Sequence, residues 1–187
     1  MLPGAGHGPF GNVFDIVAYE LAGAGKRVFR VETWESREEL EAKSLDELHA
    51  EVDAAVDYLR SNGCSTVDLI AKSFGGGVAL SHDLDAVDRL LLWAPAVEVG
   101  VDAAAANDPG EEVGESEDVL IGIEDLDVDV LVRILVGDED RGVSVDDCRR
   151  IADAVGDGDM TVIPGENHSF NENRTAVVEH TLRYLSS

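Results

Sequence analysis

Lysine, cysteine and long apolar runs are all scarce in this sequence of 187 residues. No run approaches the roughly 20 apolar residues that a membrane-spanning helix needs, and no basic segment followed by an apolar one opens the chain. Cys64 and Cys148 lie far apart, and neither belongs to a Cys-x-x-Cys or Cys/His metal-binding pattern. We therefore predict a cytoplasmic protein with reduced cysteines, no metal and no membrane contact.

Positive charge is also rare. Asp and Glu number 39 against 14 Lys and Arg, which gives a formal net charge of -25. The acids are spread along the chain rather than gathered in a tail, and this composition resembles that of haloarchaeal, salt-loving proteins. An ordinary acidic protein from a mesophile remains the alternative. Because charge of this sign repels polyanions, we expect neither nucleic acid nor an anionic membrane as a partner.

Short apolar runs rich in β-branched residues alternate with helical patterns along the chain. The runs predict buried strands at 27–33, 66–72, 89–94, 130–136 and 160–164. Strand alternating with helix predicts an α/β fold, in which a mostly parallel sheet of about six strands has helices on both faces. The length suits a single domain, residues 1–187, without a linker.

Three helices have recognisable ends. Ser44 and Glu47 form a capping box, and the helix they begin stops at Asn62-Gly63. A second helix follows Ser144, and the last begins at about Asn171. We expect the second to bury Val145, Cys148, Ile151, Ala152 and Val155, and the last to bury Val178, Leu182 and Leu185.

Three of the predicted strands end in polar residues that can do chemistry. They are followed by Ser73, by the acids Asp138 and Asp140, and by His168. In a parallel sheet, ligands bind beyond the carboxyl ends of the strands, so these groups should meet at one edge. A neutral imidazole can take the proton of a serine hydroxyl, and a carboxylate can orient the imidazole.

The segment Ala71-Lys72-Ser73-Phe74-Gly75 resembles the nucleophile elbow of the α/β-hydrolase superfamily, with alanine in place of the first glycine. The order serine, acid, histidine is also that of the family. The resemblance implies a small, lidless serine hydrolase with Ser73 as nucleophile, His168 as base and Asp140, rather than Asp138, as acid. It also implies an oxyanion hole made by the N–H groups of Phe74 and Ala5, and no cofactor.

Such an enzyme would cleave a carboxylic ester, thioester or related small acyl substrate through an acyl-enzyme, as a monomer or homodimer. The cap region, 96–129, is very short, so we expect an open, shallow site. Its acids would surround that site with negative charge: Glu98, Asp102, Asp108, Glu111, Glu112, Glu115, Glu117 and Asp118.

Two other functions remain open. The pattern Gly6-x-Gly8-x-x-Gly11, with Glu32 after the next strand, also fits a dinucleotide-binding fingerprint, although Pro9 falls inside the loop. The second alternative is a non-catalytic binding protein with the α/β-hydrolase fold.

The resemblance also places a central strand before Gly4, between the strands at 27–33 and 66–72. Only Met1 and Leu2 are present to form it, whereas strands usually run about five residues. We expect apolar residues ahead of Leu2 in the natural gene product, or otherwise a stub of Met1 and Leu2 between those two strands.

The charge leads to a first prediction, which concerns salt. Below a few tenths molar KCl, repulsion among the carboxylates should unfold the protein, because the screening length is about 3 Å only near 1 M salt. Melting temperature measured against KCl concentration should therefore rise. A flat or falling curve would show that the acidic composition has another cause.

Overall fold

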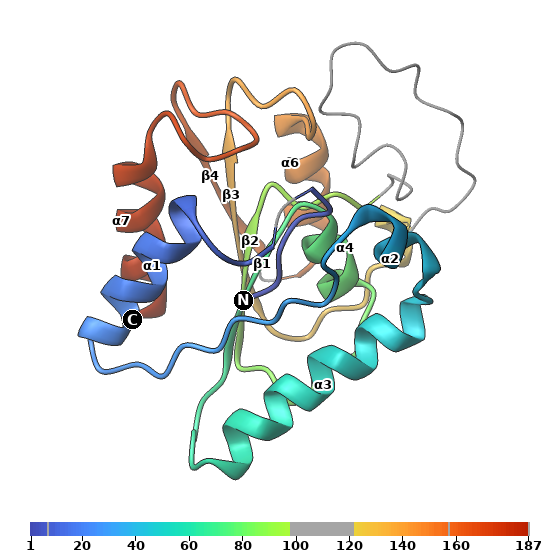
Figure 1. Ribbon diagram of the computed structural model, residues 1–187. Coiled ribbons are helices and arrows are strands. Elements are labelled where there is room, and N and C mark those ends of the chain that lie inside the picture. The colour runs from blue at the N-terminus through green and yellow to red at the C-terminus, as the bar shows by residue number, and fades with distance from the viewer. Residues whose placement is uncertain (7, 98–121, 157, 187) are drawn as a thin grey trace.

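The computed structural model describes residues 1–6, 8–97, 122–156 and 158–186, apart from the side chains of Arg37 and Glu124. A parallel sheet in the order β1-β2-β3-β4 forms the centre (Figure 1). Its strands are β1 (Asp68–Lys72), β2 (Arg89–Trp93), β3 (Leu131–Gly137) and β4 (Gly158–Ile163). The parallel α/β fold is confirmed, and these strands lie within about two residues of the predicted bounds.

The expected number of about six strands is wrong for the described residues, which contain four. The predicted strand at 27–33 is not among them. That segment and the first residues of the chain are joined by too few backbone hydrogen bonds to make a ladder, because Met1 and Leu2 offer only two residues for pairing.

Helices cover both faces of the sheet. In Figure 1, α1 and α7 pack together on one face, and α3, α4 and α6 lie on the other. The helical elements are α1 (Asn12–Gly23), α2 (Arg37–Ala42), α3 (Leu45–Ser61), α4 (Phe74–Leu80), the 3₁₀ turn η1 (Ile123–Asp125), α6 (Val145–Ala154) and α7 (Arg174–Leu185). None of the helices in the described parts of the chain has the length and apolarity that a membrane crossing requires.

The predicted helix starts are confirmed at two places. The Ser44 hydroxyl accepts from the Glu47 N–H at 3.3 Å, and the Glu47 carboxylate accepts from the Ser44 N–H at 2.8 Å, which completes the capping box. Ser144 caps α6 through the Asp147 N–H at 3.0 Å. Cys148, Ile151 and Ala152 of α6 are buried as expected, as is Val155 just after the helix, and Val145 is half-buried.

The last helix differs from its prediction. It begins at Arg174, about one turn late, and it buries Val177, Thr181 and Leu185, whereas Val178 and Leu182 are only half-buried. Residues at i, i+4 and i+8 form one stripe, so 178 and 182 border that stripe. Because Thr181 is polar, a prediction based on apolar residues alone did not identify this stripe.

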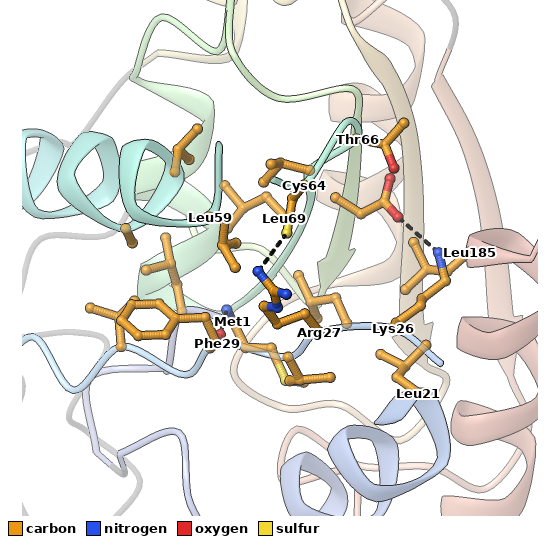
Figure 2. Close-up of a pocket in the computed structure, with 18 of the residues that line it drawn as sticks. Met1, Leu21, Lys26, Arg27, Phe29, Leu59, Cys64, Thr66, Leu69 and Leu185 are labelled. Atoms are coloured by element: carbon orange, nitrogen blue, oxygen red, sulfur yellow. Dashed lines mark hydrogen bonds and ion pairs between the residues drawn. The ribbon is translucent and has the colours of Figure 1, made fainter. Parts of the chain in front are cut away.

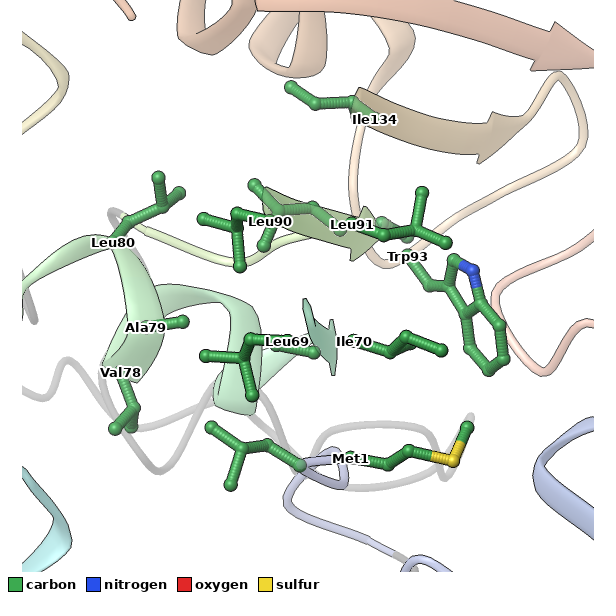
Figure 3. Close-up of a cluster of buried hydrophobic side chains, with 14 of the residues drawn as sticks. Met1, Leu69, Ile70, Val78, Ala79, Leu80, Leu90, Leu91, Trp93 and Ile134 are labelled. Atoms are coloured by element: carbon green, nitrogen blue, oxygen red, sulfur yellow. The ribbon is translucent and has the colours of Figure 1, made fainter. Parts of the chain in front are cut away.

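The core is continuous through the sheet, since strands covered on both faces are apolar throughout. Leu90, Leu91 and Leu92 of β2 have no exposed surface. Figure 3 shows Leu69 and Ile70 of β1 packed between β2 and the side chain of Met1. Met1 thus lies in the core of the molecule, beside β1.

Backbone hydrogen bonds place Met1 and Leu2 between β1 and the extended segment around Phe29. The Leu2 N–H donates to the Ile70 carbonyl at 2.8 Å, and the Leu2 carbonyl accepts from the Lys72 N–H at 3.2 Å. On the other side, the Met1 nitrogen donates to the Phe29 carbonyl at 2.8 Å, and the Met1 carbonyl accepts from Val31 at 3.2 Å. The expected flanking order is confirmed, and the two residues form a stub.

Burial of the Met1 ammonium, with a further effect of the Arg30 charge, lowers its pKa from 8.0 to about 5. The amine therefore binds a proton more readily in the unfolded chain than in the folded one. Between these two pKa values the unfolded state holds more protons, so stability increases as pH rises through this range.

We predict that the free energy of unfolding falls by as much as about 4 kcal/mol between pH 8 and pH 5 because of this group. Urea unfolding across that range measures the slope. Protein acetylated at the Met1 nitrogen is the control, since it has no charge to lose. Equal slopes for the two proteins would assign the effect to other titrating groups.

Candidate active site

Ser73 lies in a strained turn between β1 and α4. Its φ of 51° and ψ of -120° are unfavourable for a residue with a side chain. The turn is fixed by its backbone: the Ser73 N–H donates to the Trp93 carbonyl at 2.9 Å, and the Ser73 carbonyl accepts from Gly76 at 2.8 Å. This geometry is that expected of a nucleophile elbow, which lifts a side chain above the end of the sheet.

The turn needs a small residue on its far side. A Cβ atom at Gly75 would lie 2.4 Å from the Pro3 carbonyl oxygen, so only glycine fits there. Instead, the Gly75 N–H donates to that oxygen at 3.2 Å and ties the N-terminal loop to α4. The alanine at position 71 is fully buried, so the sheet accommodates its methyl group.

The three residues predicted from the strand ends come together. The Ser73 Oγ lies 3.0 Å from His168 Nε2, and His168 Nδ1 lies 2.9 Å from Asp140 Oδ2. The Asp140 side chain has no exposed surface, and its Oδ1 accepts the N–H groups of Gly142 and Val143, each at 2.8 Å. These bonds hold the carboxylate toward the imidazole.

Asp138, the other candidate acid, faces a different partner. Its Oδ1 accepts the Gly165 N–H at 2.6 Å. The neighbouring Glu139 N–H donates to the Glu166 carbonyl at 3.0 Å, so the loop after β3 and the loop after β4 are bound together. Asp138 therefore helps to position the His168 loop. Among the described residues, the carboxylate that is hydrogen-bonded to the imidazole ring is that of Asp140.

Glu166 is a structural residue of the site that the sequence analysis missed. It is fully buried, and its carboxylate accepts N–H groups from Asn167 at 2.9 Å, Glu172 at 3.1 Å and Asn173 at 2.7 Å. These bonds fix the loop that carries His168 to the start of α7. An acid shortly before a helix start was the available signal, since such residues often cap the free N–H groups there.

Ala5 and Phe74 were predicted as backbone donors for an oxyanion. Phe74 directly follows Ser73 at the start of α4, and Ala5 is buried in the loop that Gly75 holds through Pro3. Within the described residues, neither N–H donates to a backbone carbonyl outside helices and strands.

A cavity of about 640 Å³ opens beside Ser73 and His168. The N-terminal loop and the segment around Trp34 form its walls, and Phe10, Glu32 and Lys72 also line it. Its volume falls in the range typical of small-molecule sites. The acids predicted to surround the site, from Glu98 to Asp118, lie outside the described residues, as does most of the short cap region.

Lys72 is both a residue of the cavity wall and a buried amine. Its Nζ lies 5.9 Å from the centre of the Phe170 ring. Burial lowers the pKa of Lys72 to about 8, although the nearby Asp140 charge acts in the opposite direction. In the described residues, no group of His, Cys, Asp and Glu side chains gathers in a metal-binding arrangement.

Among the comparisons with known proteins, the one with solved structures identifies the fold. Neither protein-family models nor curated protein sequences give a match. Among solved structures, Est1E from Butyrivibrio proteoclasticus matches with a TM-score of 0.75 and 17% identity, over 96% of this chain and 82% of its own. Dienelactone hydrolase from Anabaena variabilis matches with a TM-score of 0.68 and 18% identity, over 98% and 82%.

A structure of the metagenome-derived lipolytic enzymes LipS and LipT is similar as well, with a TM-score of 0.67 and 15% identity, over 93% of this chain and 87% of its own. At such low identity the likeness concerns architecture. This fold counts against the dinucleotide-binding alternative. The glycines of that pattern, Gly6, Gly8 and Gly11, line the cavity beside Ser73, as does Glu32. The chain has the α/β-hydrolase fold.

Proposed function

We propose that this protein is a serine hydrolase that cleaves a small carboxylic ester or thioester through an acyl-enzyme. The observation that carries the proposal is the continuous hydrogen-bonded series from Ser73 Oγ through the His168 ring to the Asp140 carboxylate. The strained conformation of Ser73 supports it, because strain of this kind is retained where function requires it.

In the proposed reaction, His168 Nε2 takes the proton of the Ser73 hydroxyl as the oxygen attacks the substrate carbonyl carbon. The carbonyl oxygen becomes an oxyanion and accepts the N–H groups of Phe74 and Ala5, each worth about 3 kcal/mol in the transition state. His168 then protonates the leaving alcohol or thiol as its bond to carbon breaks. Water, activated by His168, attacks the acyl-enzyme and restores the Ser73 hydroxyl as the acid leaves.

Asp140 would hold the imidazole in the tautomer that leaves Nε2 free to accept a proton. It would also stabilise the imidazolium formed after the transfer. The two N–H groups on Oδ1 keep the carboxylate fixed, so little reorganisation is needed when the charge moves.

The substrate class rests on the cavity and on the related structures. A cavity of about 640 Å³ admits a small acyl group and its leaving group. One structure of Est1E has ferulic acid bound. We therefore choose feruloyl esters as test substrates, together with short-chain and long-chain p-nitrophenyl esters. A non-catalytic binding protein is the competing function, and the fold alone is compatible with both.

The first test concerns Ser73→Ala. Loss of the hydroxyl should remove ester hydrolysis and labelling by a fluorophosphonate, while the melting temperature stays close to that of the parent protein. We expect kcat to fall at least about 100-fold, measured with p-nitrophenyl esters in molar KCl. A parent protein that neither hydrolyses esters nor takes the label would instead favour the binding function.

The second test separates the two acids. Asp140→Asn should lower kcat by about 10³- to 10⁴-fold, because asparagine favours the wrong imidazole tautomer. Asp138→Asn is the matched control, and it should mainly lower the melting temperature, since Asp138 accepts the Gly165 N–H. Greater loss of kcat in Asp138→Asn, at equal folded fractions, would mean that Asp138 is the acid.

A further inference from the structure

The chain has three lysines, and two of them lie beside carboxylates. Lys26 Nζ is 3.3 Å from Asp68 Oδ2, a contact that Figure 2 marks with a dashed line. Lys43 Nζ is 2.5 Å from Glu51 Oε1. Within the described residues, Lys72 makes neither a hydrogen bond nor an ion pair through its amine. One of the few lysines thus has no counter-ion in that part of the chain, although the sequence contains 39 acids.

Lys72 lies at the cavity beside the proposed nucleophile. It ends β1 directly before Ser73, and it lines the cavity of about 640 Å³ together with Ser73 and His168. The residue as a whole is half-buried, and the described buried atoms without a hydrogen-bond partner do not include its Nζ. Because Nζ has no such partner, it must instead retain accessible surface. The amine can therefore be reached from the cavity.

The surroundings of this amine leave its charge uncompensated. The ring of Phe170, which is fully buried, lies 5.9 Å from Nζ. A ring face attracts a cation but carries no net charge. The Asp140 carboxylate favours the charged amine, yet it is hydrogen-bonded to His168, and burial still lowers the pKa of Lys72 to about 8. Near neutral pH the amine is therefore largely protonated and poorly solvated.

Two acids also line the cavity, but neither is paired with Lys72. Glu32 and Glu35 are exposed, so water solvates them and salt screens them. The Glu32 carboxylate lies against the N-terminal loop, where a Cβ at Gly8 would be 2.8 Å from its Oε1. The cavity thus has exposed negative groups and one desolvated positive group. A ligand with a single negative charge can neutralise Lys72, whereas a second negative charge would be repelled by the acids.

We propose that Lys72 binds a carboxylate of the substrate, so that the ester or thioester cleaved at Ser73 carries one further carboxylate near its scissile carbonyl. The cleavage step rests on the proposed function, whereas the carboxylate site rests on Lys72. Adjacent Cα atoms are only about 3.8 Å apart, so a ligand with a short chain between its two groups would reach both side chains. An ammonium and a carboxylate form a charge-assisted hydrogen bond, which is roughly twice as strong as a neutral one.

The test measures binding, so that it does not depend on hydrolysis. Ser73→Ala protein in molar KCl is titrated with the monomethyl esters of succinic, glutaric and adipic acid, and with the corresponding dimethyl esters, which are neutral. NMR shifts report each affinity. At pH 7, at least one half-ester should bind at least about tenfold more tightly than its diester, because only the half-ester can neutralise Lys72. Equal affinity in all three pairs would overturn the proposal.

Two further substitutions in the same protein assign the difference to one side chain. Lys72→Met should abolish the preference for the half-ester, since it keeps an aliphatic side chain and removes the charge. Arg149→Gln is the matched control, because it removes an exposed positive charge on α6 that does not line the cavity, and the preference should remain. Equal losses in the two variants would assign the preference to the net charge of the protein and reject a site at Lys72.

The pH dependence gives an independent readout. The half-esters are ionised from pH 7 to pH 9.5, and their affinity should fall about tenfold across this range as Lys72 loses its proton. Lys72→Arg keeps its charge in the same range, so its affinity should stay constant. Both proteins have the same other titratable groups near the amine, which are Asp140, His168, Glu32 and Glu35. Titration of those groups would appear in both proteins, so equal slopes would contradict the proposal.

The carboxylate site and the proposed function can fail separately. Preference for half-esters in Ser73→Ala, together with a parent protein that hydrolyses no ester, would keep the carboxylate site and reject the hydrolase. Hydrolysis of p-nitrophenyl esters by the parent protein, without any preference for half-esters in Ser73→Ala, would keep the hydrolase and show that Lys72 binds no carboxylate.

Discussion

The hydrogen bond from the Gly75 N–H to the Pro3 carbonyl connects the two halves of the proposed oxyanion site. It forms only because residue 75 has no side chain, since a Cβ atom there would overlap the carbonyl oxygen. Through this contact, the turn at Ser73 and the loop containing Ala5 are held by the same backbone. The backbone hydrogen bonds between Leu2 and β1 then attach the N-terminal loop to the sheet. The glycine at position 75 thus helps to position both proposed backbone donors, Ala5 and Phe74, around Ser73.

Much of the sheet could be predicted because its strands are short apolar runs buried on both faces. The polar residues that follow them had to meet at one edge, and Ser73, His168 and Asp140 do so within hydrogen-bonding distance. The residue pattern alone does not distinguish Asp138 from Asp140, and the resemblance to the α/β-hydrolase superfamily favoured Asp140. In the structure, the hydrogen bonds of each acid separate them.

Other features gave no clear sequence signal. Glu166 is one of 39 acids, and only the fold shows that its carboxylate is buried and accepts three backbone N–H groups. Helix α1 was not predicted, because it follows a glycine-rich loop and has no side-chain cap at its start. Among the described residues, the segment 27–33 makes its ladder-like backbone hydrogen bonds with Met1 alone. A strand also needs partners along its length, and these cannot be judged from its own residues.

The buried carboxylate of Glu166 affects how the proposed catalytic site responds to heat. It bonds both to the loop carrying His168 and to the N–H groups that precede α7, so the two cannot move independently. Helix ends open more readily than the centre of a sheet. Fraying at the start of α7 would therefore release the imidazole from Ser73 while the strands remain paired. Loss of the proposed catalytic geometry would then precede loss of the fold, and the C-terminal helix would set the upper temperature at which Ser73 and His168 stay in contact.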